Sequence, residues 1–274
     1  MVSVVILTFQ EEISIKDCLE SLEGFDDVHI VDSGSTDRTL EIAAAYPCRI
    51  ATHPFRSFGD QRNWALKTLD LRYDWILFLD ADERITPAFK TALMDEIRRS
   101  DSSVAGFYCC WKLMLENTWL KRSDFFPRWQ FRLLHKDRAC FQDFGHGQKE
   151  SIISGKIDYL HEPYLHYAFL KGWNDWWNKH LRYAAQEAKE RSKYRFRFQE
   201  LLSSHASIRN KSLKTLLTRL PWWPFVRWFY PWGIRGGFLD GKNSFQYCWK
   251  ISRFEKEVQS QLRIIERNRR LSKK

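Results

Sequence analysis

Apolar runs and helix-like segments alternate along the first part of the chain. Three segments have the length and apolar character of buried strands, namely Val4–Leu7, Val28–Val31 and Trp75–Leu79, and Arg49–Thr52 is a candidate for a further short strand. Between them, apolar residues recur every three or four positions, which is typical of helices that bury one face. Three such helices are predicted. The first begins at Ser14, the second follows the polar turn at Asp32 and reaches Ala45, and the third spans Gln61–Leu69. The alternation predicts βαβ units and a mostly parallel sheet covered by helices.

The pattern changes further along the chain. After a predicted helix that starts at Pro87, three segments read as strands: Val104–Leu115, Gln130–Leu134 and Ser151–Tyr159, the last with a turn at Gly155. From Lys171 onward, aromatic residues recur at helical spacing and strand patterns end. We therefore place a boundary near Ala168, with an α/β domain over residues 1–168 and a helical region over residues 169–274.

The strand Trp75–Leu79 ends in two carboxylates, Asp80 and Asp82, which are separated by one alanine. Side chains at i and i+2 of an extended segment point the same way, and ligands bind at the carboxyl ends of strands in open α/β sheets. Two carboxylates this close favour a divalent cation such as Mg²⁺ or Mn²⁺ between them. The alternative from the residues alone is a surface turn that caps the following helix.

Other polar residues follow the neighbouring strands at the same predicted edge. Glu11 comes after the first strand and Asp32 after the second. A helix cap satisfies only its own helix, so acids at successive strand ends favour a shared ligand. A nucleotide fits, because ribose hydroxyls and a base N–H donate hydrogen bonds to carboxylates and a metal at Asp80 and Asp82 neutralises a diphosphate. Arg62 adds a positive charge there; the alternative is a solvated helix residue.

The composition of the chain limits the classes of binding partner but does not select one of them. The net charge is +10, which favours anionic partners such as a phosphate-bearing ligand, nucleic acid or an acidic membrane surface. The six cysteines lack paired C-x-x-C spacing, which predicts a reducing compartment and no zinc site. No uncharged apolar run approaches the roughly 18 residues that a spanning helix needs, so no such helix is predicted.

Four segments stand in a characteristic order: VSVVILTFQEE, VDSGSTDRTLEIA, FGDQRNWAL and WILFLDADERI. Together they resemble the family 2 glycosyltransferases, in the branch that includes lipopolysaccharide-core β-glucosyltransferases. Looser similarity continues in FPRWQFRLLHKDRACF, RLPWWPFVRWFY and IRGGFLDG, so the resemblance covers nearly the whole chain. It implies a GT-A fold, which is a Rossmann-like nucleotide-sugar-binding domain with a mixed, mostly parallel sheet. It also implies a nucleotide-diphosphate sugar donor, a divalent metal on the D-x-D motif and inversion at the anomeric carbon.

The resemblance also implies roles for individual residues. Carried over by position, Thr8, Glu11 and Asp32 hold the nucleoside, Arg62 lies near the diphosphate, and Asp80 and Asp82 straddle ribose and metal. The family usually has Asn where this chain has Gln10. Gln keeps the amide on a longer arm, so we expect altered nucleoside contacts rather than lost binding.

An inverting transfer needs a base that takes the proton of the acceptor hydroxyl. The expected source is DFGHGQKE, where the branch more often has a His-Glu pair. We prefer Glu150 because it follows a glycine-flanked loop of the kind that closes over a donor. Asp143 is the alternative. For His146 we expect a place in the metal shell, a contact with the diphosphate, or a structural role in the loop.

The carboxyl-terminal part is basic and aromatic. Basic residues outnumber acids between Lys189 and Arg219, and a Trp- and Pro-rich stretch follows from Trp222 to Trp232. This combination suits a segment that lies on an anionic leaflet; the alternative is a helical subdomain packed by these aromatics. We expect no nucleic-acid partner, because no RNA-binding or helix-turn-helix signature is present. The expected location is cytoplasmic, peripheral on the inner face of the cell membrane.

The leading hypothesis is a hexosyltransferase that uses a UDP-sugar to build a surface polysaccharide, lipopolysaccharide or lipid-linked glycan. A nucleotidyltransferase also uses strand-end carboxylates with a metal, but it needs a glycine- and lysine-rich phosphate loop, which LTFQEE is not. A third hypothesis is a non-enzymatic basic module for membranes or nucleic acid, whose carboxylates are helix caps. That module predicts no metal-dependent nucleotide binding.

Overall fold

The computed structural model describes residues 1–144 and 147–271, which divide into two compact units. Unit 1 comprises Met1–Lys121 and Phe125–Lys171. Unit 2 comprises the chain from Gly172 onward together with the short segment Arg122–Asp124. The change from strands to helices therefore falls close to the predicted boundary at Ala168, whereas no local pattern indicates that residues 122–124 join the second unit.

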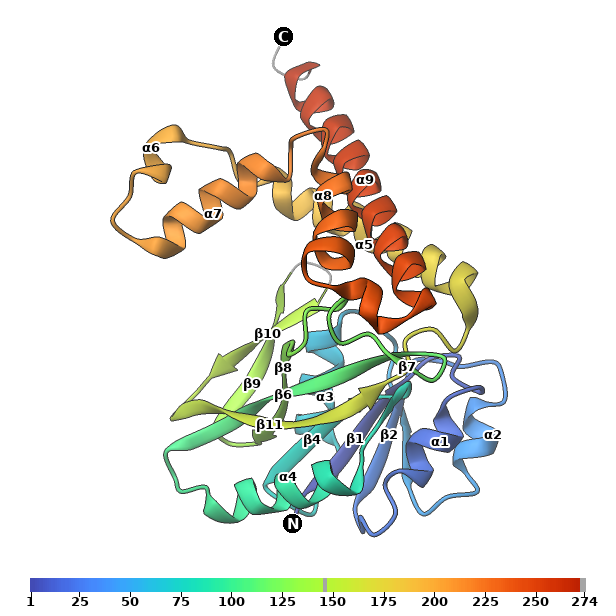
Figure 1. The fold of residues 1–274 in the computed structure, drawn as a ribbon. Coiled ribbons are helices and arrows are strands. Elements are labelled where there is room, and N and C mark those ends of the chain that lie inside the picture. Colours follow the sequence, from blue (N-terminus) through green and yellow to red (C-terminus); the bar gives the residue numbers. More distant parts are fainter. Residues whose placement is uncertain (145–146, 272–274) are drawn as a thin grey trace. The chain divides into compact units, whose positions relative to one another are not determined.

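Unit 1 is built from strands and helices in alternation (Figure 1). In chain order its elements are β1 (Ser3–Thr8), α1 (Ile15–Glu20), β2 (Val28–Asp32), α2 (Thr39–Ala43), β3 (Arg49–Thr52), α3 (Phe58–Thr68), β4 (Trp75–Asp80), β5 (Glu83–Arg84), α4 (Pro87–Arg99), β6 (Val104–Leu115), β7 (Thr118–Trp119), β8 (Trp129–His135), β9 (Ala139–Phe144), β10 (Gly147–Ile152) and β11 (Lys156–His166).

The main sheet has the strand order β3-β2-β1-β4-β8-β6-β11-β5. Strands β3, β2, β1 and β4 run parallel to one another, and β8 is antiparallel to both β4 and β6. Strands β6 and β11 are again parallel. This arrangement confirms the predicted α/β class with a mixed central sheet, and the half that carries the strand-end acids is parallel throughout.

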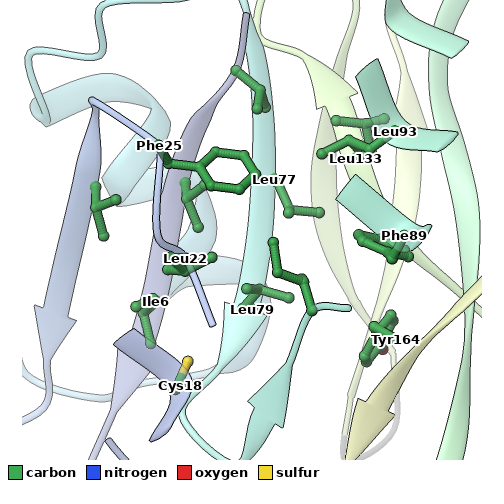
Figure 2. Close-up of a cluster of buried hydrophobic side chains, with 14 of the residues drawn as sticks. Ile6, Cys18, Leu22, Phe25, Leu77, Leu79, Phe89, Leu93, Leu133 and Tyr164 are labelled. Carbon is green, nitrogen blue, oxygen red and sulfur yellow. The ribbon is translucent and has the colours of Figure 1, made fainter. Parts of the chain in front are cut away.

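Two apolar clusters cover the faces of this sheet. On one face, Leu22, just after α1, and Phe89 and Leu93 of α4 pack in one cluster with Leu77 and Leu79 of the sheet (Figure 2). On the other face, α3 and the β9–β10 hairpin pack Ala65 and Phe141 against the alternate residues of β4, Ile76 and Phe78. The unbroken apolar run in β4 is therefore buried on both faces, as its lack of alternation predicts.

Unit 2 is helical. Its elements are α5 (Gly172–Ser192), α6 (Phe198–Leu201), α7 (Ala206–Leu217), α8 (Trp223–Phe229), the π-helical turn η1 (Tyr230–Ile234), the 3₁₀ turn η2 (Gly237–Asp240) and α9 (Lys242–Leu271). Helices α5 and α9 pack through Ala184, Ala188, Val258 and Leu262. Asp240 accepts hydrogen bonds from the backbone N–H groups of Arg122 and Ser123, both at 2.8 Å, which explains why that segment belongs to this unit. Over residues 1–144 and 147–271, no helix is both long enough and apolar enough to cross a bilayer.

A buried carboxylate beside the amino-terminal end of β2 makes unit 1 sensitive to acid. Asp27 accepts hydrogen bonds from the Ser3 hydroxyl at 2.5 Å and from the Arg72 backbone N–H at 2.9 Å, and His29 Nε2 lies 2.9 Å from it. Burial alone would raise the pKa of Asp27, but these hydrogen bonds hold it below its usual value. The carboxylate therefore stabilises the fold above the unfolded pKa of about 3.9, and this stabilisation is lost as pH falls through the folded pKa.

Asp27→Asn is expected to lower the free energy of unfolding by about 2–3 kcal/mol at neutral pH. The gap between wild type and variant should shrink as pH falls below about 4, because the carboxylate becomes protonated first in the unfolded chain and then, at lower pH, in the folded protein. Urea unfolding of both proteins at several pH values measures this gap. Asp26→Asn is the matched control, because the Asp26 side chain is 54% exposed beside Arg72. A gap for Asp27→Asn that does not change with pH would contradict the prediction.

Candidate active site

The ends of the parallel strands gather the predicted polar residues at one edge of unit 1. In the strand register, Thr8 lies opposite Asp32, and Leu7 lies opposite Asp80. The Thr8 hydroxyl donates a 2.9 Å hydrogen bond to Asp32 Oδ1. Three of the residues singled out from the sequence are thus brought to the same edge by the register of β1, β2 and β4.

Asp32 orders the polar turn that follows β2. Its Oδ2 accepts hydrogen bonds from the backbone N–H groups of Gly34 at 2.8 Å and Ser35 at 2.7 Å, and its Oδ1 accepts from the Ser35 hydroxyl. Gly34 has φ +93°, a conformation that glycine adopts without strain. The Asp32 side chain is fully buried in this role. The expected contact between Asp32 and a nucleoside stays a prediction.

Gln10 joins the loop after β1 to the same turn. Its backbone has φ +57°, and its side-chain Nε2 donates to the Thr36 hydroxyl at 2.8 Å. Its Oε1 accepts from the Asp37 backbone N–H at 3.1 Å. The long amide arm of Gln10 therefore holds two loops together at the edge where a nucleoside is expected.

Asp80 is the counter-ion of two buried arginines. Arg62 Nη2 lies 2.9 Å from Asp80 Oδ1, and Arg132 Nη2 lies 2.6 Å from Asp80 Oδ2. Arg132 Nη2 also lies 2.5 Å from Glu83 Oε1, and both arginine side chains are only 1% exposed. Burial alone would raise the pKa of Asp80, but the guanidiniums of Arg132 and Arg62 hold it well below its usual range. Asp80 therefore remains ionised, with both oxygens already engaged.

Arg62 is more deeply placed than a solvated helix residue. Its guanidinium lies between the rings of Phe58, Phe78 and Phe141, 5.7–5.8 Å from their centroids. It donates a 2.7 Å hydrogen bond to Gln148 Oε1, and burial lowers its pKa to about 10. Arg62 therefore links α3, β4 and β10, and its expected place near the diphosphate stays a prediction.

Asp82 meets a histidine that the sequence did not single out. His166, at the end of β11, places Nε2 3.5 Å from Asp82 Oδ2, and the two side chains are 24% and 20% exposed. Burial alone would lower the pKa of His166, but the Asp82 carboxylate raises it. Asp82 is thus partly accessible to solvent and lies beside an imidazole, a side chain of a type that can coordinate metals.

Glu11 lies within electrostatic reach of Asp82. Burial, and then the charge of Asp82, raise the pKa of Glu11, while Lys171 opposes both effects. Lys171 Nζ lies 2.5 Å from Glu11 Oε1. The edge therefore combines two carboxylates, an imidazole and a lysine ammonium, a set suited to a ligand that carries both hydroxyl groups and negative charge.

The donor set fits a divalent ion only in part. Across the residues that the structure describes, no group of three or more His, Cys, Asp or Glu side chains is arranged to hold a metal ion. Asp82 and His166 supply two donors, and Mg²⁺ or Mn²⁺ bound with a substrate diphosphate commonly uses one or two carboxylates and few other protein ligands. Asp82 and His166 fit this pattern better than Asp80, whose oxygens a metal would share with two arginines.

The described residues of DFGHGQKE lie on two antiparallel strands, β9, which ends at Phe144, and β10, which begins at Gly147. Asp143, on β9, accepts a 3.2 Å hydrogen bond from the Gly59 backbone N–H in the first turn of α3. Glu150, on β10, is hydrogen-bonded to the Tyr108 hydroxyl, and after burial this bond is the main cause of the raised pKa of Tyr108. The expectations for His146 fall on a residue outside the described part of the chain. Both candidate bases thus have identified partners in unit 1.

Sequence reasoning missed Arg132, Glu83, Gln148, Lys171 and His166. Arg132 carries a readable signal, because it interrupts the apolar run of β8 and a charge inside a buried strand requires a partner. His166 carries none, since it reaches Asp82 only through the pairing of β11 with β5, where it lies opposite Glu83.

Comparison with known proteins identifies relatives of the chain. Residues 3–148 match glycosyl transferase family 2. The lipopolysaccharide core biosynthesis glycosyltransferase LpsC of Rhizobium meliloti (strain 1021) is 35% identical over 107 residues, which cover 37% of this chain and only 39% of LpsC. The uncharacterized glycosyltransferase RC0292 of Rickettsia conorii is 25% identical over 265 residues, covering 87% of this chain and 84% of that protein.

Among solved structures, residues 1–349 of S. aureus TarS in complex with UDP are 14% identical to this chain. The similarity covers 92% of this chain and 91% of that one, with a TM-score of 0.44. The family match extends from β1 into β10 and includes the ends of β1, β2 and β4, whereas His166 at the end of β11 lies beyond it. The chain therefore belongs to glycosyl transferase family 2.

Proposed function

We propose that the chain transfers a sugar from a UDP-sugar to a glycan or lipid-linked acceptor in the assembly of cell-surface polysaccharide or lipopolysaccharide. The observation that carries the proposal is the meeting of Asp82 and His166 at the edge where β1, β2 and β4 end. Ligands of open α/β sheets bind at this edge. The choice of pathway class is supported by the similarity to LpsC, a lipopolysaccharide core biosynthesis glycosyltransferase.

We assign the nucleoside to Thr8, Glu11 and Asp32, the residues that follow β1 and β2. Carboxylates accept hydrogen bonds from ribose hydroxyls and from a base N–H. Glu11, held by Lys171, is the carboxylate of this set with solvent access, since its side chain is 16% exposed and Asp32 is buried. Asp32 contributes by fixing the turn at Ser35, and Asp80 by keeping Arg62 in place at the base of the site.

Asp82 and His166 would hold a divalent cation, Mg²⁺ or Mn²⁺. When bound, such an ion neutralises the charge that develops on a leaving diphosphate. The protein's own contribution at this point is to present a carboxylate and an imidazole on the rigid ends of β4 and β11. The rigidity comes from Tyr167, whose backbone N–H donates a 2.9 Å hydrogen bond to the Asp82 carbonyl.

The transfer itself is proposed to be a single displacement with inversion. The base takes the proton of the acceptor hydroxyl as its oxygen bonds to the anomeric carbon, while the bond from that carbon to the diphosphate oxygen breaks. We assign the base to Glu150, with Asp143 as the alternative. Glu150 lies two positions beyond Gln148 on the same face of β10, and Gln148 bonds the arginine that holds Asp80.

A hydrolysis screen with the purified full chain tests the proposed donor and metal. The screen offers UDP-glucose, UDP-galactose, UDP-N-acetylglucosamine and GDP-linked sugars. We expect one of the UDP-sugars to release nucleotide diphosphate in the presence of Mn²⁺ or Mg²⁺, and we expect EDTA to stop the release. In the same assay with an acceptor, Glu150→Gln should lower kcat by about 10²–10⁴-fold, with Asp143→Asn much less affected. The opposite order would assign the base to Asp143. Absence of any hydrolysis, together with no metal-dependent UDP binding by calorimetry, would overturn the proposal.

A further inference from the structure

Unit 2 presents large aromatic side chains to solvent on α8, η2 and the start of α9. We call this set the aromatic patch. It comprises Phe225, Phe229, Phe238, Phe245 and Trp249, which are 39–57% exposed. Single exposed apolar residues are common on protein surfaces, but a continuous group of this kind marks an interaction site. These rings therefore indicate an interaction site only if they contact one another and form a single surface.

Ring contacts join the aromatic patch into one surface. Phe225 and Phe229 stack with their centroids 5.7 Å apart. Trp228 contacts Phe229 at 6.2 Å, Phe245 at 5.6 Å and Trp249 at 6.2 Å. Trp232 extends the surface from Phe245, at 5.6 Å, to Phe238, at 6.3 Å. The patch is therefore continuous across α8, η1, η2 and the start of α9, four elements that follow one another in the chain.

The charges around the aromatic patch have one sign at the surface. Between Trp222 and Lys250 the chain has four basic residues and a single acid, Asp240. Asp240 is only 7% exposed, and its carboxylate accepts hydrogen bonds from the backbone of residues 122 and 123. The basic residues include Arg235 and Lys242, both exposed, on either side of η2. A partner of this surface must therefore tolerate apolar rings and bring negative charge.

Exposed aliphatic side chains beside the aromatic patch favour a lipid leaflet over nucleic acid as its partner. Ile234 and Leu239 are 67% and 62% exposed, more than any ring of the patch. Single-stranded nucleic acid binds by stacking bases on open aromatic faces, and aliphatic side chains offer no such face. In the patch, the rings of Phe225 and Phe229 stack on each other, with an angle of 9° between their planes. Rings and aliphatic groups together suit the boundary between headgroups and acyl chains.

We propose that the aromatic patch docks this protein onto an anionic lipid leaflet. The rings, with Ile234 and Leu239, enter the headgroup–acyl boundary, and Arg235 and Lys242 meet the lipid phosphates. The proposal goes beyond the sugar transfer proposed above and does not depend on it. In the same unit, the segment of α6 and α7 extends away from the α5–α9 pair (Figure 1) and carries exposed Arg195, Arg197, Arg209, Lys211 and Lys214, which add positive charge.

Sedimentation of the full chain with vesicles tests the proposal. Wild type should bind vesicles of phosphatidylcholine and phosphatidylglycerol, and bind pure phosphatidylcholine about tenfold or more weakly. Phe225→Ser with Leu239→Ser should weaken binding to the mixed vesicles about tenfold or more, because both apolar groups are lost from the interface. Arg235→Glu with Lys242→Glu should also weaken it and should remove most of the preference for anionic lipid.

Matched controls come from unit 1. Ile50→Ser with Ile153→Ser removes two exposed apolar groups, which are 40% and 64% exposed, outside the patch. Lys67→Glu with Arg99→Glu makes the same change in net charge at exposed positions of α3 and α4. Both controls should bind vesicles as wild type does. The proposal is overturned if wild type does not bind the mixed vesicles, if patch variants and controls bind equally, or if the chain binds only single-stranded RNA offered in place of lipid.

Discussion

Replacing Asp82 by alanine is expected to lower the rate of sugar transfer by about 10³-fold or more while the protein keeps its fold. The Asp82 side chain is partly exposed, and His166 Nε2 lies 3.5 Å from its carboxylate. Its backbone carbonyl, which accepts from Tyr167, is unchanged by the substitution. The loss should therefore fall on the chemistry, and the free energy of unfolding should stay close to that of wild type.

Asp80→Ala provides the contrast. It leaves the two buried guanidiniums of Arg62 and Arg132 without the carboxylate that both contact, so it should lower stability as well as activity. Urea unfolding and a transfer assay on both variants separate the two effects. His166→Ala should resemble Asp82→Ala and should raise the Mn²⁺ concentration needed for half-maximal rate. Sugar transfer retained in Asp82→Ala would exclude Asp82 as the metal ligand.

The local sequence pattern predicted those strands and helices whose bounds depend on neighbouring residues in the chain. The strand over Val104–Leu115 has the predicted bounds, and Thr86 caps α4 by accepting a 3.1 Å hydrogen bond from the Phe89 backbone N–H. The helix expected to reach Ala45 is shorter, since α2 spans Thr39–Ala43. The predicted turn at Gly155 does break the segment Ser151–Tyr159, and it separates β10 from β11. A turn residue shows that the chain reverses, but not which partner each flanking strand takes.

The candidate site was predictable only where strand register decides it. Thr8, Asp32 and Asp80 meet because parallel strands end at one edge, which the alternating pattern indicates. The partners of Asp80 come from 18 and 52 residues away in the chain, and no spacing rule reaches them. The same holds for His166, which reaches Asp82 through a strand that the sequence placed only as far as Tyr159. The local sequence pattern predicts which residues lie at the carboxyl-terminal edge of the sheet. It does not predict which charged side chains pair there, because those pairs depend on how distant segments pack.

Arg132→Met is expected to destabilise unit 1 by about 3–5 kcal/mol. Arg132 is 1% exposed and contacts Asp80 at 2.6 Å and Glu83 at 2.5 Å. Without it, the Glu83 carboxylate stays buried with the hydroxyl of Tyr164, at 3.1 Å, and the backbone N–H of Asp80, at 2.9 Å, as its remaining partners. Burial already raises the pKa of Glu83, and in the intact protein Arg132 is the main group that opposes this effect.

The cause of this destabilisation can be tested by removing the second charge. Glu83→Gln keeps an oxygen for Tyr164 and the Asp80 backbone but is neutral, so Arg132→Met with Glu83→Gln should recover about 1 kcal/mol or more of the loss. Urea unfolding of the two single variants, the double variant and wild type measures this coupling energy. Arg98→Met is the control for loss of an arginine side chain, because Arg98 is 77% exposed on α4 and should cost little. Additive effects of the two substitutions would show that Arg132 acts by packing its side chain rather than by compensating the buried carboxylates.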